Sequence, residues 1–343
     1  MKNINTMKVL LCEEPTKLIY QQRELPKAKA NEAVIKILNV GICGTDIHAW
    51  AGNQPFFSYP RVLGHEICGE IMTLGNDVHH MHVGQRVAVI PYVACHHCNS
   101  CLSGKTNCCE NISVIGVHQD GGFCEYLSVP VSNLLAVDDV DPISAALIEP
   151  FAISAHAVRR ADVHPDEHIL VVGAGPIGLG VAAIALADGA QVVMADTSMQ
   201  RRQHVDNMLN IVALDPSDAD FEQQLRQQFS GMLPLKVIDA TGNQHAMNNT
   251  VNLIRHGGSI VFVGLFKGLL SFSDPDFHKK ETTMMGSRNA TFEDFAKVGQ
   301  LMAERKLYAD MILTHYFEFN TLADVYEQQV VKNKDLIKGI IRF

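Results

Sequence analysis

Short apolar stretches separated by turn residues dominate the N-terminal part of the chain. They occupy residues 7–11, 33–38, 70–74 and 86–90. Clusters of Gly, Pro and Asn punctuate them. Short apolar runs that are bounded by such residues are typical of β-strands. The pattern therefore predicts a β-rich, barrel-like domain from about residue 8 to about residue 135.

The pattern changes after Pro150, where strand-like runs alternate with helical periodicity. It predicts strands at 169–172, 191–195, 236–239 and 259–263, and helices that begin at about 176 and cover about 243–254. Two more helical stretches are expected at 292–304 and 322–331, followed by a strand at 338–343. Because strands that alternate with helices form parallel sheets, this part is expected to be an α/β domain.

Composition narrows the class of protein and of partner. A chain of 343 residues with 47% apolar content is expected to form two domains with ordinary cores. A formal charge of −9 and the lack of a Lys/Arg run argue against a nucleic-acid or anionic-membrane partner and favour a small molecule. The apolar run at 9–11 is too short for a signal peptide, so a cytoplasmic location is expected.

Four cysteines form the clearest chemical motif. Cys95, Cys98 and Cys101 follow one another at two-residue gaps, and Cys109 closes the set. Four thiolates at this spacing are typical of a tetrahedral structural zinc. An iron–sulfur cluster is the alternative, but it would place the fourth Cys nearer and before a Pro. Cys108 competes with Cys109 for the fourth position.

A glycine fingerprint follows the first strand of the second domain. Gly173, Gly175 and Gly178 have the spacing G-x-G-x-x-G and include Pro176 and Ile177 at the expected helix start. This arrangement binds the pyrophosphate of a dinucleotide at a helix N-terminus. Asp196 ends the next predicted strand, eighteen residues after Gly178, and favours NAD over NADP. Arg201 and Arg202 leave open a contact to a 2′-phosphate, and a glycine-rich turn without a ligand is the alternative.

Three residues upstream of the four cysteines could form a second, open zinc site. Cys43, His65 and a carboxylate match the three protein ligands of a catalytic zinc, which keeps one position for water or substrate. Taken singly, a Cys is more often a packed thiol and a His a satisfied core or surface residue. Spacing alone does not decide between these interpretations.

Taken together, these motifs resemble those of a known family. The matching stretches are 41–48, Gly64-His65-Glu66, the four cysteines, Glu149-Pro150, the glycine fingerprint and Val263-Gly264-Leu265. The sequence is similar over essentially its whole length to the zinc-dependent medium-chain alcohol and polyol dehydrogenases. The resemblance implies a GroES-like catalytic domain at 1–150 and 288–343, with the zinc sites and substrate cleft. It also implies a Rossmann domain with a doubly wound parallel sheet at 151–287, which binds NAD.

The resemblance also implies roles for the residues near Cys43. Cys43 and His65 would hold the catalytic zinc, with Glu66 and Glu149 as two candidates for the third ligand. Asp46 would orient His65, although an Asp at this place could equally cap the loop. Thr45 would take the hydroxyl proton and pass it to His48 and solvent.

The cofactor contacts are likewise implied by the family. Backbone groups of two segments would hold the nicotinamide ring: Val263, Gly264 and Leu265, and Gly286, Ser287 and Arg288. Asp196 and Arg201 would hold the adenosine end. Family members form dimers or tetramers, which implies a homo-oligomer.

Within this family the sequence is most similar to the bacterial sugar-acid dehydrogenases. That resemblance implies oxidation of L-galactonate at C5, with D-tagaturonate as product. Arg288 would bind the substrate carboxylate, with His118 as a further contact, and Phe56, Phe57 and Tyr59 would wall the pocket. Another polyol, another hexonate or L-threonine are the alternative substrates. A non-catalytic regulatory relative is the alternative class.

Overall fold

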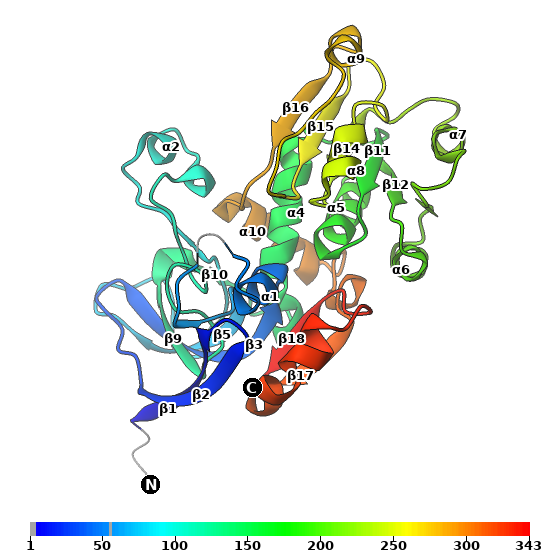
Figure 1. Cartoon of the computed structure of the whole chain (residues 1–343). Coiled ribbons are helices and arrows are strands. Elements are labelled where there is room, and N and C mark those ends of the chain that lie inside the picture. Colours follow the sequence, from blue (N-terminus) through cyan, green and yellow to red (C-terminus); the bar gives the residue numbers. More distant parts are fainter. Residues whose placement is uncertain (1–4, 55–56) are drawn as a thin grey trace. The chain divides into compact units, whose positions relative to one another are not determined.

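The computed structural model describes residues 5–54 and 57–343, and these form two compact units (Figure 1). The first unit contains residues up to Glu149 together with Thr291–Ala309 and Leu313–Phe343. The second contains Pro150–Ala290 and Asp310–Ile312. The chain therefore leaves its first unit, builds the second, and returns to complete the first.

The first unit is built mainly from strands. Its strands are β1 (Thr6–Glu14), β2 (Lys17–Glu24), β3 (Glu32–Ile42), β4 (Arg61–Val62), β5 (Glu66–Leu74), β6 (Arg86–Val89), β7 (Tyr92–Val93), β8 (Ser113–Val114), β9 (Tyr126–Pro130), β10 (Leu134–Ala136), β17 (His315–Glu318) and β18 (Gly339–Arg342). Its helices are α1 (Gly44–Trp50), α2 (Asn99–Leu102), α3 (Pro142–Ala146), α10 (Phe292–Ala303) and α11 (Leu322–Val325).

The longest strand, β3, organises this unit. It pairs with β5, β9 and β18, and the sheet continues in the order β10-β6-β5-β3-β18-β17. Alternation along β3 is weak because both of its faces are largely buried, and Val34, Ile35 and Val40 belong to these buried positions. β3 ends at Ile42, immediately before the segment that carries Cys43. The pairing of β3 with β5 places Gly41 opposite Glu66.

The second unit is a parallel sheet with helices. Its elements are β11 (His168–Val172), α5 (Pro176–Ala187), β12 (Gln191–Ala195), α6 (Met199–Leu209), β13 (Ala213–Leu214), α7 (Phe221–Gln228), β14 (Lys236–Asp239), α8 (Gln244–Asn249), β15 (Ser259–Phe262), α9 (Asp274–Lys279) and β16 (Thr283–Gly286), and α4 (Ile148–Arg160) leads into it. The strand order is β13-β12-β11-β14-β15-β16, and every pair is parallel. This is the strand order of dinucleotide-binding folds, so the predicted fold class is confirmed.

The structure differs from the sequence prediction at several helices. The helix predicted for 243–254 ends at Asn249, because Asn252 and Leu253 donate to carbonyls three residues back and continue the chain as turns. The helix predicted for 322–331 is α-helical only to Val325 and continues as a π-helix over Tyr326–Val331. Helices α4 and α6 were not predicted.

Candidate active site

Cys43, His65 and Glu66 lie together in the first unit. One donor atom from each of these side chains lies within 4.8 Å of the other two. His65 and Glu66 are buried, and Cys43 is partly buried. His65 Nδ1 and Glu66 Oε2 have no hydrogen-bond partner among the described residues. A thiolate, an imidazole and a carboxylate are donors that zinc prefers, so this arrangement fits a zinc ion with an open position.

Glu149 is not part of this close group, although it is buried in the first turn of α4. Its Oε1 accepts a hydrogen bond from the Tyr92 hydroxyl. Burial raises the pKa of Glu149, while His65 opposes that rise, so the two side chains sense each other's charge. The structure therefore places Glu66 with Cys43 and His65, whereas Glu149 is hydrogen-bonded to Tyr92.

Asp46 connects the two segments that carry Cys43 and His65. Its Oδ2 accepts from the backbone N–H of Cys43 at 2.9 Å, and its Oδ1 accepts from the backbone N–H of Gly64 at 3.0 Å. The first bond is part of a capping box at the start of α1. His65 Nδ1 lies 3.8 Å from Asp46 Oδ1, which is ion-pair range but too long for a hydrogen bond. Asp46 thus caps the loop and faces His65.

Lys338 supplies a positive charge to the same site from β18's N-terminal end. Its Nζ lies 2.5 Å from Glu66 Oε1 and also donates to the backbone oxygen of Ile42. Burial lowers the pKa of Lys338, but the attraction of Glu66 and Cys43 outweighs this, and the net effect raises the pKa. His65 behaves similarly, because burial is outweighed by the Cys43 thiolate and Asp46, and its pKa is raised well above its usual value. The negative charges of Cys43, Asp46 and Glu66 therefore stabilise the protonated forms of Lys338 and His65.

The residues predicted for proton transfer lie on α1, directly after Cys43. Thr45 is partly buried, and His48 is exposed about one turn further along the helix. His118 is exposed, and its Nδ1 accepts from the backbone N–H of Val114 at 3.0 Å. The rings of Phe57 and Tyr59 lie 4.8 Å apart. Phe56 lies outside the described residues.

The four cysteines of the motif come together in a small lobe that contains α2. The sulfur atoms of Cys95, Cys98, Cys101 and Cys109 lie within 4.8 Å of one another. The sulfurs of Cys98 and Cys109 are 4.0 Å apart, close to the roughly 3.8 Å separation expected around a tetrahedral zinc. Backbone hydrogen bonds from His97 and Cys98 help lower the pKa of Cys95 to about 6, which favours the thiolate. Cys108 is exposed and is not part of this group.

The glycine fingerprint has the geometry of a dinucleotide site. Gly173 has a φ of 97°, which the tight turn after β11 requires. A Cβ on Gly178 would lie 1.8 Å from the backbone oxygen of Gly173, so only Gly allows this close approach. A Cβ on Gly175 would meet only open space, where a pyrophosphate could approach. Pro176 begins α5 and Ile177 follows it, so the N-terminus of α5 comes directly after this turn.

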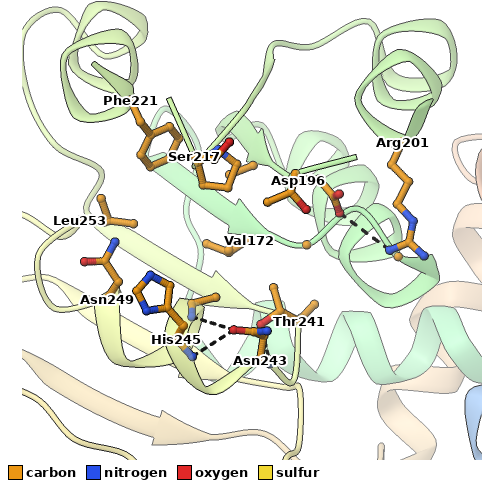
Figure 2. Close-up of a pocket in the computed structure, with 17 residues that line it drawn as sticks. Val172, Asp196, Arg201, Ser217, Phe221, Thr241, Asn243, His245, Asn249 and Leu253 are labelled. Carbon is orange, nitrogen blue, oxygen red and sulfur yellow. Dashed lines mark hydrogen bonds and ion pairs between the residues drawn. The ribbon is translucent and has the colours of Figure 1, made fainter. Parts of the chain in front are cut away.

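A cavity of about 600 Å³ lies beside this turn and is drawn in Figure 2. Gly173, Gly175, Asp196 and Arg201 are among the residues that line it. Asp196 follows β12, and its two carboxylate oxygens accept from the backbone N–H groups of Ala174 at 2.7 Å and Ser198 at 2.8 Å. Arg201 forms an ion pair with Asp196 at 3.9 Å (Figure 2).

The remaining predicted cofactor residues lie at the carboxyl ends of the neighbouring strands. Val263, Gly264 and Leu265 follow β15, and the backbone N–H groups of Val263 and Gly264 both donate to Asp239 O. Gly286 ends β16, and Ser287 and Arg288 follow it. Ligands of parallel sheets bind at this edge. The sheet therefore brings both segments to the edge that also carries Gly175 and Asp196.

Sequence reasoning missed Tyr92 and Lys338. Lys338 pairs with Glu66 and the Tyr92 hydroxyl donates to Glu149, but neither residue stands in a recognisable motif. Lys338 is separated from Glu66 by 272 residues, and only the pairing of β18 with β3 brings them together. The sequence carries no signal for this pairing, because the burial of Lys338 becomes visible only in the fold.

Two family models match the chain, and together they span both units. The alcohol dehydrogenase GroES-like domain matches residues 29–139. The zinc-binding dehydrogenase model matches residues 176–304. The chain belongs to the zinc-binding alcohol dehydrogenases and is an oxidoreductase that acts on a small-molecule alcohol.

Several individual relatives are similar to this chain over nearly its whole length. L-galactonate-5-dehydrogenase of Escherichia coli K12 is 71% identical over 340 residues, which cover 99% of this chain and 100% of the relative. The starvation-sensing protein RspB of the same organism is 33% identical and covers 98% and 99% of the two chains. A crystal structure of RspB from E. coli CFT073 in complex with NADH has a TM-score of 0.92, 31% identity, and coverage of 99% and 100%. No helix among the described residues is long and apolar enough to span a membrane.

Proposed function

We propose that this protein is a zinc-dependent dehydrogenase that oxidises the C5 hydroxyl of L-galactonate with NAD. The observation that carries the proposal is the 71% identity to L-galactonate-5-dehydrogenase over nearly the whole chain. The candidate zinc donors and the dinucleotide cavity supply the two parts that such a reaction needs. The alternative of a non-catalytic relative would call for a broken site, and the residues predicted for catalysis are all present.

The catalytic zinc would be held by Cys43, His65 and Glu66, which already lie together. When bound, zinc acts as a Lewis acid that stabilises an alkoxide. Glu149 would stay on Tyr92 and approach the site as a polar neighbour. Asp46 would keep the Cys43 and His65 segments in register through its two backbone hydrogen bonds. The second zinc would be held by the four cysteines of the α2 lobe and would stabilise that lobe.

Proton removal is assigned to the residues of α1. Thr45 would accept the hydroxyl proton of the substrate and pass it on through hydrogen bonds. His48 is exposed one turn later, so it can exchange that proton with solvent. An imidazole can both accept and donate a proton, which suits this last position.

NAD would bind along the carboxyl edge of the parallel sheet. Gly173, Gly175 and the N-terminus of α5 would take the pyrophosphate. Asp196 would accept the adenosine ribose hydroxyls, because each carboxylate oxygen has a second lone pair beside its present bond. Val263–Leu265 and the segment 286–288 would hold the nicotinamide end through backbone groups.

A sugar acid carries a carboxylate, and we propose that Arg288 binds it, with His118 as a further contact. Replacing Arg288 by Met is expected to raise KM for L-galactonate about 10- to 100-fold, as the loss of a charge-assisted hydrogen bond implies. KM for a neutral polyol such as galactitol should change little, because that substrate has no carboxylate. Initial rates of NADH formation with both substrates measure this difference.

The matched control for Arg288 is Arg305→Met, an exposed arginine of the first unit. It removes the same charge and should leave both KM values unchanged. Equal losses for acid and polyol in the Arg288 variant would contradict its assignment and would point to a cofactor contact instead.

We further propose that the chain forms a homodimer or homotetramer through the edge of its parallel sheet. β16 is the last strand in the sheet order, so one of its edges has no partner strand in the described chain (Figure 1). The segment 265–272, between β15 and α9, exposes Leu265, Leu269 and Phe272. Open strand edges pair readily with a second strand. A monomer mass in sedimentation velocity at micromolar concentration would contradict the proposal.

We propose that the protein works in the cytoplasm. All nine of its cysteines are free thiols, and metal-binding thiols persist in a reducing compartment. Cell fractionation tests this location, and recovery of the protein outside the cytoplasmic fraction would contradict it.

A further inference from the structure

Helix α6 carries two arginines close to Asp196, and only one of them faces the dinucleotide cavity. Arg201 lines that cavity. Arg202 instead forms an ion pair with Asp215, with Nη1 at 2.8 Å from Oδ2. The same Nη1 donates to the backbone oxygen of Asp196 at 2.7 Å. The Arg202 and Asp215 side chains are only 21% and 19% exposed, so their contact is largely shielded from solvent.

Arg202 is close enough to matter for the choice of cofactor. Its guanidinium contacts the backbone of Asp196, the residue whose carboxylate is assigned to the adenosine ribose. NADP differs from NAD by a phosphate on that ribose, and arginine is the side chain best suited to bind phosphate. An unrestrained guanidinium at this place would therefore favour NADP. Asp215 holds the Arg202 guanidinium in an ion pair and adds a negative charge beside it.

The turn that carries Asp215 is itself part of the cavity wall. Asp215 Oδ1 accepts from the backbone N–H of Ser217 at 3.0 Å and from its hydroxyl at 2.6 Å. These bonds from Ser217 lower the pKa of Asp215, which keeps the carboxylate ionised. Pro216 and Ser217 line the cavity, and Figure 2 shows Ser217 and Asp196 among its lining residues. The carboxylate thus links the cavity wall to Arg202.

We propose that Asp215 determines cofactor specificity by withholding Arg202 from the 2′-position of the adenosine ribose. The inference rests on the proposed use of NAD and deepens it, because it assigns the exclusion of NADP to a residue outside the fingerprint. Asp196 would exclude the phosphate by direct repulsion. Asp215 would exclude it by holding the Arg202 guanidinium in an ion pair, while the second nearby cation, Arg201, is paired with the Asp196 carboxylate.

The test is Asp215→Asn in the full-length, zinc-loaded enzyme, with NADH and NADPH as probes. Asn can still accept from Ser217 through its side-chain oxygen, but it offers no charge to Arg202. The dissociation constant for NADPH, measured by nucleotide fluorescence, should fall about tenfold, as one new charge-assisted hydrogen bond implies. The constant for NADH should change much less. Arg202→Met in the Asp215→Asn background should abolish the gain.

The matched control is Asp218→Asn, which removes the same charge three residues away. The exposed Asp218 side chain accepts a hydrogen bond from Gln224 and is not among the residues that line the cavity, so its loss should leave both dissociation constants unchanged. If the ratio of the NADH and NADPH dissociation constants is the same in Asp215→Asn as in Asp218→Asn, the inference is overturned. The use of NAD would be left intact. Wild-type protein that binds neither nucleotide would overturn the cofactor assignment itself.

A further variant tests the inference even if Asp215→Asn does not fold. Asp215→Ser also removes the carboxylate, so its dissociation constant for NADPH should likewise fall about tenfold because Arg202 is released in the same way. An unchanged or larger dissociation constant for NADPH in Asp215→Ser would overturn the inference.

Discussion

A Cys43→Ser variant is expected to lose at least about 10³-fold in kcat, because the metal's contribution of several kcal/mol to the barrier disappears with its thiolate ligand. NADH should still bind with an unchanged dissociation constant. The dinucleotide cavity is lined by residues between Val172 and Leu253 and does not include Cys43. Zinc content, measured by mass spectrometry, should fall by about one ion per chain, because the four-cysteine lobe keeps its own.

Cys108→Ser is the control for this variant. It also replaces a thiol by a hydroxyl, but Cys108 is exposed and lies outside both groups of candidate ligands. Its activity and zinc content should equal those of wild type. Full activity in Cys43→Ser, or loss of both zinc ions from it, would contradict the assignment of Cys43 to a separate catalytic site.

A Lys338→Met variant is expected to lose about 3–5 kcal/mol of unfolding free energy, because a buried carboxylate is left without its partner. The Lys338 and Glu66 side chains are 2% and 0% exposed, so water cannot replace the lost charge. Urea unfolding can be followed by the fluorescence of Trp50. That residue is the chain's single tryptophan and lies buried in the same unit as Lys338. Added zinc should recover part of the loss, since it supplies positive charge to Glu66.

The control for Lys338 is Lys332→Met. Lys332 pairs with Glu327 at 2.6 Å, nearly the distance of the buried pair, but both side chains are more than half exposed. Exposed pairs contribute little to stability because solvent screens them. A loss in Lys338→Met no larger than that in Lys332→Met would show that the buried ion pair does not hold the site together.

The parallel sheet was predictable because its strands carry continuous apolar runs. The predicted strands at 191–195 and 236–239 coincide with β12 and β14. Such strands are buried on both faces, so their sequence signal is strong. The helix ends were less predictable. The apolar residues Val251, Leu253 and Ile254 continue a helical pattern, yet they are buried from turns after Asn249. Burial of an apolar residue does not specify the backbone that delivers it.

The candidate site was predictable only where its residues stand in local motifs. The four cysteines and the glycine fingerprint could be found from spacing, because one short segment supplies each whole set. Cys43, His65 and Glu66 needed the family resemblance, since 22 and 23 residues separate the latter two from Cys43. Lys338, Tyr92 and Asp215 act through pairings between distant segments. Those pairings are set by the tertiary fold and cannot be derived from local sequence.

The most direct test of the account is the initial rate of NADH formation with L-galactonate beside sorbitol, L-threonine and L-gulonate at matched concentrations. The proposed function predicts that kcat/KM for L-galactonate exceeds the others by at least about 100-fold, because a site built around a substrate's polar groups discriminates strongly against analogues that leave those groups unpaired. Equal and low rates with all four substrates, or a higher kcat/KM with L-threonine or sorbitol, in protein that holds both zinc ions, would contradict it.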